Sequence, residues 1–157
     1  MGFLTGKTAI ITGAGRAVLK DGSCGSIGYG IATAYAKEGA NLVITGRNVK
    51  KLEAAKQELE SLYGIKVLTV QADVCAGGNN EATVANVVKQ AVDTFGGIQV
   101  LINNAQASAS GVPLTEHTTE QFDLAIYSGL YAAFYYMKAC YPYLAESHGS
   151  VINFASG

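Results

Sequence analysis

The sequence predicts an α/β protein with a doubly wound parallel sheet, the Rossmann-like arrangement. Three observations support this prediction: strand and helix patterns alternate along the whole chain, the strand segments are apolar throughout, and a glycine-rich loop separates the first strand from the first helix. Continuous apolar strands between amphipathic helices are typical of a parallel sheet that is covered on both faces. Right-handed crossover connections then predict the doubly wound topology.

The strand patterns are short and alternate with longer helix patterns. Strands are expected over residues 8–12, 41–45, 67–70, 100–102 and 151–154. Helices are expected over residues 27–38, 49–63, 81–95 and 121–145. Residues 14–25 fit neither pattern, so we expect them to form one irregular insertion. No internal repeat or linker divides the sequence, which predicts a single domain over residues 1–157.

Glycines, a proline and apolar spacing predict how the helices end and which side faces the sheet. Gly39 and Gly64 are expected to end the first two helices. Pro142 is expected to break the fourth helix, because proline lacks the backbone N–H group. In the second helix, apolar residues recur at helical spacing: Leu52, Ala55, Leu59 and Leu62. In the third helix, the residues expected to face inward are Val84, Val87, Val88, Ala91 and Val92.

Composition and charge exclude several classes of protein. The 157 residues are 49% hydrophobic and 15% charged, and the net charge is -1, which argues against disorder and against nucleic acid or a membrane surface as partner. Cys24, Cys75 and Cys140 lack disulfide or metal-ligand spacing, and His117 and His148 do not form a zinc motif. No signal peptide and no segment long enough to span a bilayer is recognisable. We therefore expect a cytoplasmic protein with reduced thiols and no metal.

The loop after the first strand has the composition of a phosphate-binding loop. It begins Thr12-Gly13-Ala14-Gly15, and after the insertion it continues Gly25-Ser26-Ile27-Gly28-Tyr29-Gly30 into the first helix. Glycines let the backbone approach a pyrophosphate, and a helix N-terminus offers N–H groups and the positive end of its dipole. The alternative is that the glycines form only a turn. Because this loop joins a strand to a helix, we instead interpret it as a cofactor-binding loop and residues 1–157 as a dinucleotide-binding domain.

The end of the second strand indicates which dinucleotide is bound. NAD-binding folds commonly carry a carboxylate there to hold the ribose hydroxyls, whereas this strand ends Thr45-Gly46-Arg47-Asn48. The guanidinium of Arg47 suits a 2′-phosphate, so we expect NADP in preference to NAD. The alternative is that Arg47 is a solvated loop residue.

Polar residues follow three further strands at the edge where ligands bind in such folds. Asp73 follows the third strand, Asn103-Asn104-Ala105-Gln106 ends the fourth, and Asn153-Phe154-Ala155-Ser156 ends the fifth. The carboxyl ends of parallel strands meet at one edge, so we expect these residues to converge on one crevice.

In this order, the motifs resemble those of the short-chain dehydrogenase/reductase family, and the resemblance covers essentially the whole chain. It implies an enzyme that transfers a hydride between NAD(P) and a small molecule. It implies that Gly13, Ser26, Ile27 and Gly28 face the cofactor pyrophosphate. It also implies that Asp73 and Val74 hold the adenine, and that Asn104 and Ala105 border the adenosine ribose. Ser156 falls at the family's catalytic serine, which hydrogen-bonds the substrate oxygen.

The sequence departs from the family pattern at four places. Residues 14–25 lengthen the glycine loop, and Ser26 replaces its second glycine, in a segment that also resembles bacterial enoyl reductases. Gln106 replaces the last glycine of Asn-Asn-Ala-Gly, and Gly129 stands where many members have an asparagine, which puts the usual water-linked proton relay in doubt. After Ser156 there is no Tyr-x-x-x-Lys pair. We therefore expect the fold to be incomplete at its C-terminal end, and residues 1–157 to be inactive alone and part of a longer protein.

Three segments, residues 103–113, 122–144 and 149–157, resemble bacterial bile-acid 12α-hydroxysteroid dehydrogenases. That resemblance implies oxidation of a steroid ring alcohol with NADP. The tyrosine-rich segment within residues 121–145 is expected to pack on the sheet and on a partner subunit, which predicts a homo-oligomer. Two alternatives remain: a reductase of another carbonyl or enoyl substrate, and a non-catalytic nucleotide-sensing module.

Overall fold

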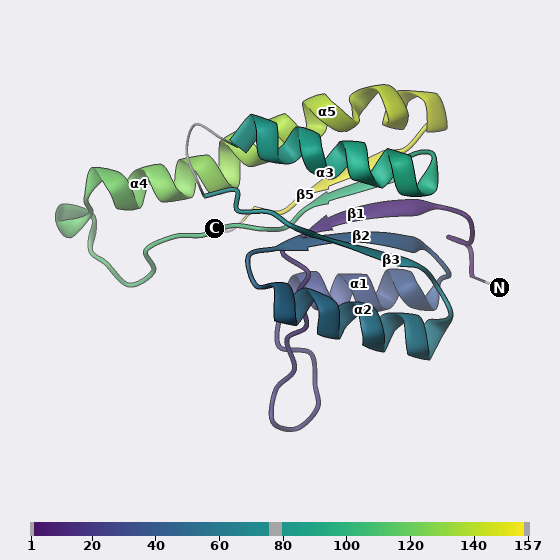
Figure 1. The fold of residues 1–157 in the computed structure, drawn as a ribbon. Helices are drawn as coiled ribbons and strands as arrows, with labels where there is room; N and C mark the ends of the chain where they lie inside the picture. Colours follow the sequence, from purple (N-terminus) through teal and green to yellow (C-terminus); the bar gives the residue numbers. More distant parts are fainter. Residues whose placement is uncertain (1, 76–79, 156–157) are drawn as a thin grey trace.

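The computed structural model describes residues 2–75 and 80–155, which form one parallel sheet between two helical layers (Figure 1). The strands are β1 (Thr8–Thr12), β2 (Asn41–Gly46), β3 (Val67–Gln71), β4 (Val100–Asn103) and β5 (Ser150–Asn153). The helices are α1 (Ile27–Lys37), α2 (Val49–Tyr63), α3 (Asn80–Phe95), α4 (Thr119–Ala125) and α5 (Ala132–Ser147). A short 3-10 turn, Leu114–Glu116, precedes α4. The predicted α/β parallel fold is confirmed.

The strand order β3-β2-β1-β4-β5 places β1 at the centre, and the chain changes its winding direction between β1 and β4. All pairings are parallel, and Ile10 lies between Val43 of β2 and Leu101 of β4. Helices α1 and α2 cover one face of the sheet, whereas α3 and α5 cover the other (Figure 1). The carboxyl ends of β1 and β4 therefore lie at a topological switch point, where ligands bind in open α/β sheets.

Alternate residues of the central strands supply two hydrophobic cores. Ile11 and Ile44 pack with α1 and α2, and Ile10 and Val43 pack with α3 and α5. These four side chains are fully buried, as expected for strands covered on both faces. The outer strand β5 differs, because its Ile152 is 43% exposed.

The ends of the first two helices follow from their terminal residues. Ser26 caps the N-terminus of α1 by accepting a hydrogen bond from the Tyr29 backbone N–H, and Asn48 caps α2 in the same way. Gly64 ends α2 in the left-handed conformation, with φ of 66°, and Gly39 follows α1 with φ of 84°. Both glycines therefore end their helices as predicted.

The predicted helix over residues 121–145 is wrong in its bounds and in its interruption. It begins at Thr119, where Thr118 and Gln121 form a capping box, and ends at Ser147. It is interrupted by a π-helical segment, Ile126–Tyr131, that we call the π-turn. Pro142 lies inside α5 and does not break it. Pro142 is on the exposed side of α5, where water can bind the carbonyl group that lacks its helical N–H partner.

One of the four apolar residues at helical spacing in α2 does not face the core. Leu52, Ala55 and Leu59 are buried, but Leu62 is 64% exposed. Tyr63 packs against the core at the end of α2 instead. Because the helix repeats every 3.6 residues, position 63 is closer than position 62 to the line of the earlier inward residues.

The insertion 14–25 forms a loop that projects from the sheet beside α1 (Figure 1). Val18 and Cys24 pair across it as an isolated antiparallel bridge. At its base, Glu58 of α2 accepts hydrogen bonds from the side chains of Arg16 and Tyr29. Within the described part of the chain, no helix is both long and apolar enough to cross a membrane.

Candidate functional site

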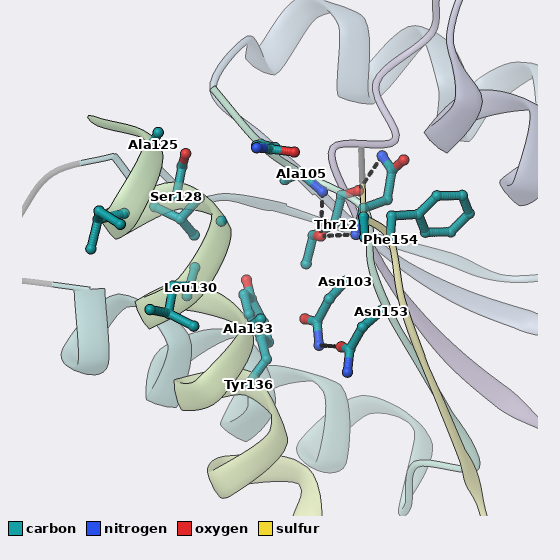
Figure 2. Close-up of a pocket in the computed structure, with 17 residues that line it drawn as sticks. Thr12, Asn103, Ala105, Ala125, Ser128, Leu130, Ala133, Tyr136, Asn153 and Phe154 are labelled. Atoms are coloured by element: carbon teal, nitrogen blue, oxygen red, sulfur yellow. Dashed lines mark hydrogen bonds between the residues drawn. The ribbon is translucent and has the colours of Figure 1, made fainter. Parts of the chain in front are cut away.

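Two adjoining cavities open at the carboxyl edge of the sheet. The larger cavity has a volume of about 310 Å³ and lies between the ends of β1, β4 and β5 and the helical segment from α4 to α5 (Figure 2). The smaller cavity, of about 220 Å³, lies beside the ends of β2 and β3. Val74, Asn104, Ala105, Gln106 and Ser128 line both. The two cavities together could hold an extended ligand.

The smaller cavity gathers most of the residues predicted to bind the cofactor. Its lining includes Gly13, Arg47, Asp73, Val74, Asn104 and Ala105. These residues come from four different strand ends, so only the parallel sheet brings them together. Their convergence agrees with the expected crevice, and their individual roles stay predictions.

The other three predicted cofactor residues form the N-terminus of α1. Gly28 is buried against the loop from β1, and a Cβ built on it would lie 2.2 Å from the Gly13 carbonyl oxygen and 2.6 Å from Asn104 Nδ2. Such distances are far inside van der Waals contact, so no side chain fits at position 28. Ser26 uses its hydroxyl to cap α1, and Ile27 is 63% exposed. Backbone N–H groups at the N-terminus of a helix can bind an anion, and the helix begins at this turn.

Thr12 joins the ends of β1 and β4, and the sequence analysis did not single it out as a site residue. Its buried hydroxyl accepts hydrogen bonds from the backbone N–H groups of Asn104 and Ala105, each at 2.9 Å. The Asn104 side chain donates to the Thr12 carbonyl at 3.0 Å. The hydroxyl also donates to the Ile102 carbonyl at 3.4 Å, so its hydrogen-bonding capacity is filled. The only sequence signal was a threonine directly before a loop glycine.

Polar groups are buried in the wall of the larger cavity. Asn103 donates a hydrogen bond from Nδ2 to Asn153 Oδ1 at 2.8 Å, which links the ends of β4 and β5 (Figure 2). Among the described residues, neither Asn103 Oδ1 nor the hydroxyl of Tyr136 has a hydrogen-bond partner. Burial raises the pKa of Tyr136 above the usual range, so this hydroxyl stays neutral. Both atoms could hydrogen-bond a ligand or water in the cavity.

The π-turn forms the opposite wall and is fastened by two side chains. Ser128 accepts a hydrogen bond from the Ala107 N–H at 2.9 Å, and its hydroxyl lies 2.7 Å from the Leu124 carbonyl. Buried Asn80, at the start of α3, donates to the Tyr127 carbonyl at 3.2 Å. Figure 2 shows Ser128 and Leu130 on this segment, across the cavity from Thr12 and Asn153. Single-turn π segments of this kind are frequent at functional sites.

The two arginines of the sequence differ in their electrostatic partners. Arg16 pairs with Glu58, and hydrogen bonds from Tyr29 and Arg16 lower the pKa of that carboxyl. Arg47 lines the smaller cavity and forms no ion pair with any residue that the structure describes. Its positive charge is therefore available to an anionic ligand.

Ser156, the predicted catalytic serine, lies outside the described residues. Its neighbour Ala155 and the preceding Phe154 line the larger cavity. Residues 2–75 and 80–155 contain no cluster of His, Cys, Asp or Glu side chains that could hold a metal ion.

Comparison with known proteins places the chain in a family. The sequence profile of the short chain dehydrogenases matches residues 7–157. The chain is 62% identical over 157 residues to a 12alpha-hydroxysteroid dehydrogenase of Clostridium sp.. This match covers 100% of the chain and 58% of that relative. It is 35% identical to an uncharacterized oxidoreductase of Staphylococcus aureus, of which it covers 61%. The chain thus spans a little more than half the length of these curated relatives.

Solved structures give the same result. The L-sorbose reductase of Gluconobacter frateurii, complexed with NADPH and L-sorbose, superposes with a TM-score of 0.82 at 30% identity, over 98% of this chain and 53% of that chain. A metagenomic short-chain oxidoreductase in complex with NADP superposes with a TM-score of 0.83 at 28% identity, over 98% and 63% of the two chains. An NAD+-bound xylitol dehydrogenase superposes with a TM-score of 0.83 at 26% identity, over 98% and 54%. On its fold, the residues at its sheet edge and these matches, the chain belongs to the short chain dehydrogenase family.

Proposed function

We propose that the protein is an NADP(H)-dependent oxidoreductase that acts on a hydroxysteroid, and that its substrate group is the 12α-hydroxyl of a bile acid. The observation that carries this proposal is the 62% identity, over the whole chain, to a 12alpha-hydroxysteroid dehydrogenase. The apolar lining of the larger cavity supports it, since Leu130, Ala133 and Phe154 would suit the hydrocarbon surface of a steroid.

The residues present fit a dinucleotide. Gly13 and Gly28 are in contact at the N-terminus of α1, where any side chain on Gly28 would collide with the Gly13 carbonyl. The backbone there can approach a pyrophosphate closely, and the helix dipole favours its negative charge. Asp73 and Asn104 line the smaller cavity beside Arg47 and would hold the adenosine half. When bound, the cofactor would accept or supply the hydride.

Arg47 supports the choice of NADP. Its guanidinium lies at the end of β2, has no acidic partner among the described residues and lines the smaller cavity. A guanidinium can bind a phosphate through two parallel hydrogen bonds, whereas the ribose hydroxyls of NAD offer it no charge. Arg16 cannot replace it while it is paired with Glu58.

At the reacting end, this chain supplies orientation and hydrogen bonds. Ser156 follows Ala155, which lines the larger cavity, and we propose that its hydroxyl hydrogen-bonds the reacting oxygen of the steroid. The Asn103–Asn153 hydrogen bond holds the ends of β4 and β5 in register. The high pKa of buried Tyr136 makes it unsuitable as a base, so its hydroxyl would serve only as a hydrogen-bonding group.

The test uses the complete gene product. It is assayed with NADP and a 12α-hydroxy bile acid, and in parallel with a bile acid that lacks only the 12α-hydroxyl. We expect NADPH to form with the first substrate alone, and more slowly when NAD replaces NADP. Equal rates with both bile acids would refute the proposed position of oxidation, and no reduction of either cofactor would refute the proposed activity.

A further inference from the structure

Gln106 occupies a distinctive position between the two cavities. It follows β4 by three residues and belongs to the lining of both the larger and the smaller cavity. A ligand that extends from Arg47 to Phe154 must therefore pass its side chain. Gln106 is exposed, and no hydrogen bond joins its carboxamide to another residue in the described part of the chain, so its acceptor oxygen and two N–H donors remain for a ligand or water.

The side chain of Gln106 lies on Gly129 of the π-turn. A Cβ built on Gly129 would be 3.6 Å from both Cγ and Nε2 of Gln106, and 3.7 Å from its Cδ. Because Gly129 has no side chain, the side chain of Gln106 can pack directly against the backbone at position 129. Gly129 lines the larger cavity and not the smaller one, so the carboxamide lies toward the larger cavity.

The backbone beside this contact is fixed by hydrogen bonds. Ser128, next to Gly129, accepts from the N–H of Ala107, next to Gln106, at 2.9 Å. The Ser128 hydroxyl also lies 3.0 Å from the Ala107 carbonyl oxygen. On the other side of Gln106, the N–H of Ala105 is held by Thr12. Gln106 is therefore an exposed side chain without polar partners on a backbone that is held on both sides, so the point from which the side chain leaves the backbone is fixed.

We infer that Gln106 is a positioning residue whose carboxamide hydrogen-bonds the nicotinamide-side half of the bound NADP(H), and that Gly129 makes room for it. This inference rests on the proposed function, since it needs a dinucleotide that extends from the smaller cavity into the larger one. It gives Gln106 and Gly129, the two residues at which the sequence departs from its family inside these cavities, one shared role.

The experiment measures binding in the complete gene product by isothermal titration calorimetry. Each variant is titrated with NADPH and with adenosine 2′,5′-bisphosphate, which has the adenosine half and lacks the nicotinamide half. Gln106→Leu retains bulk without hydrogen bonds, and Gln106→Ala removes both. For both variants we expect NADPH affinity to fall about 3- to 10-fold, the effect of losing one neutral hydrogen bond. Affinity for the bisphosphate should stay unchanged.

Gly129 provides a matched pair of variants. Gly129→Ala should weaken NADPH binding less than Gly129→Leu, because its Cβ makes only an ordinary contact with Gln106. Gly129→Leu should displace the carboxamide and weaken NADPH binding as Gln106→Leu does. In the Gln106→Leu background, Gly129→Leu should add no further loss, because the hydrogen bond is already absent.

The outcomes separate the two proposals. If the wild-type protein binds NADPH and Gln106→Leu binds it equally well, the role of Gln106 is wrong and the proposed function stands. If Gln106→Leu weakens the bisphosphate as much as NADPH, the residue acts on the adenosine half or on the fold, which also overturns the inference. If the wild-type protein binds neither ligand, the proposed function fails and this inference fails with it.

Discussion

Thr12→Val is the substitution for which the structure predicts the clearest effect on the site. Valine keeps the shape of threonine and replaces the hydroxyl by a methyl group. The change removes the acceptor of two backbone N–H groups, those of Asn104 and Ala105, each bonded at 2.9 Å. Thr12 itself is 3% exposed, so water reaches this position poorly.

The magnitude follows from the two donors left without a partner. A buried N–H group that loses its acceptor costs about 1–3 kcal/mol. Both donors here are only partly buried, so the lower end of this range applies to each. We therefore expect Thr12→Val to lower the free energy of unfolding by about 2 kcal/mol. Because Asn104 and Ala105 line both cavities, NADPH affinity should fall as well.

The assay is urea unfolding of the complete gene product, followed by far-UV circular dichroism, together with NADPH titration of the native protein. Thr8→Val is the matched control, because Thr8 is a buried residue of the same strand whose hydroxyl makes no hydrogen bond to a described residue. Thr12→Ser should retain most of the stability, since it keeps the hydroxyl. If Thr12→Val and Thr8→Val had the same unfolding midpoint, the role of Thr12 as the link between β1 and β4 would be refuted.

Three further predictions concern the cofactor, the serine and the outer strand. Arg47→Ala should weaken NADP binding about 10-fold or more and leave NAD binding nearly unchanged, because only NADP has the 2′-phosphate. Equal losses of affinity in a titration with both cofactors would contradict the assignment of Arg47 to the 2′-phosphate. Ser156→Ala in the complete gene product should lower turnover strongly with little change in NADP affinity, and turnover close to wild type would show that the serine is misplaced. Residues 1–157 expressed alone should self-associate, because Val151 and Ile152 of β5 are 40% and 43% exposed at an edge of the sheet. Size-exclusion chromatography with light scattering measures this, and a monodisperse, active protein would disprove the prediction.

Local sequence patterns were sufficient for most of the fold. Strand and helix bounds agree with the structure within one residue, except in the long segment after residue 118. Apolar runs of strand length and helical spacing depend on neighbours a few residues away, so they can be recognised without the tertiary structure. The same locality explains Gly39 and Gly64, which end their helices through their own backbone conformation.

The errors arose where distant parts of the chain decide local structure. The π-turn depends on contacts of Ser128 with Ala107 and of Tyr127 with Asn80, which are 21 and 47 residues apart in sequence. The continuation of α5 through Pro142 depends on which side of the helix meets solvent. Neither condition is visible in a window of neighbouring residues.

The sequence by itself determined which residue types lie at the strand ends, and the parallel α/β order then predicted that they would meet at one edge. Only the tertiary structure decided how they meet. It shows that Thr12 holds Asn104 and Ala105 in place and that Gln106 rests on Gly129 between two cavities. The physical reason is that side-chain hydrogen bonds and close contacts depend on distances of a few tenths of an ångström between segments far apart in sequence, whereas strand and helix patterns depend only on local periodicity.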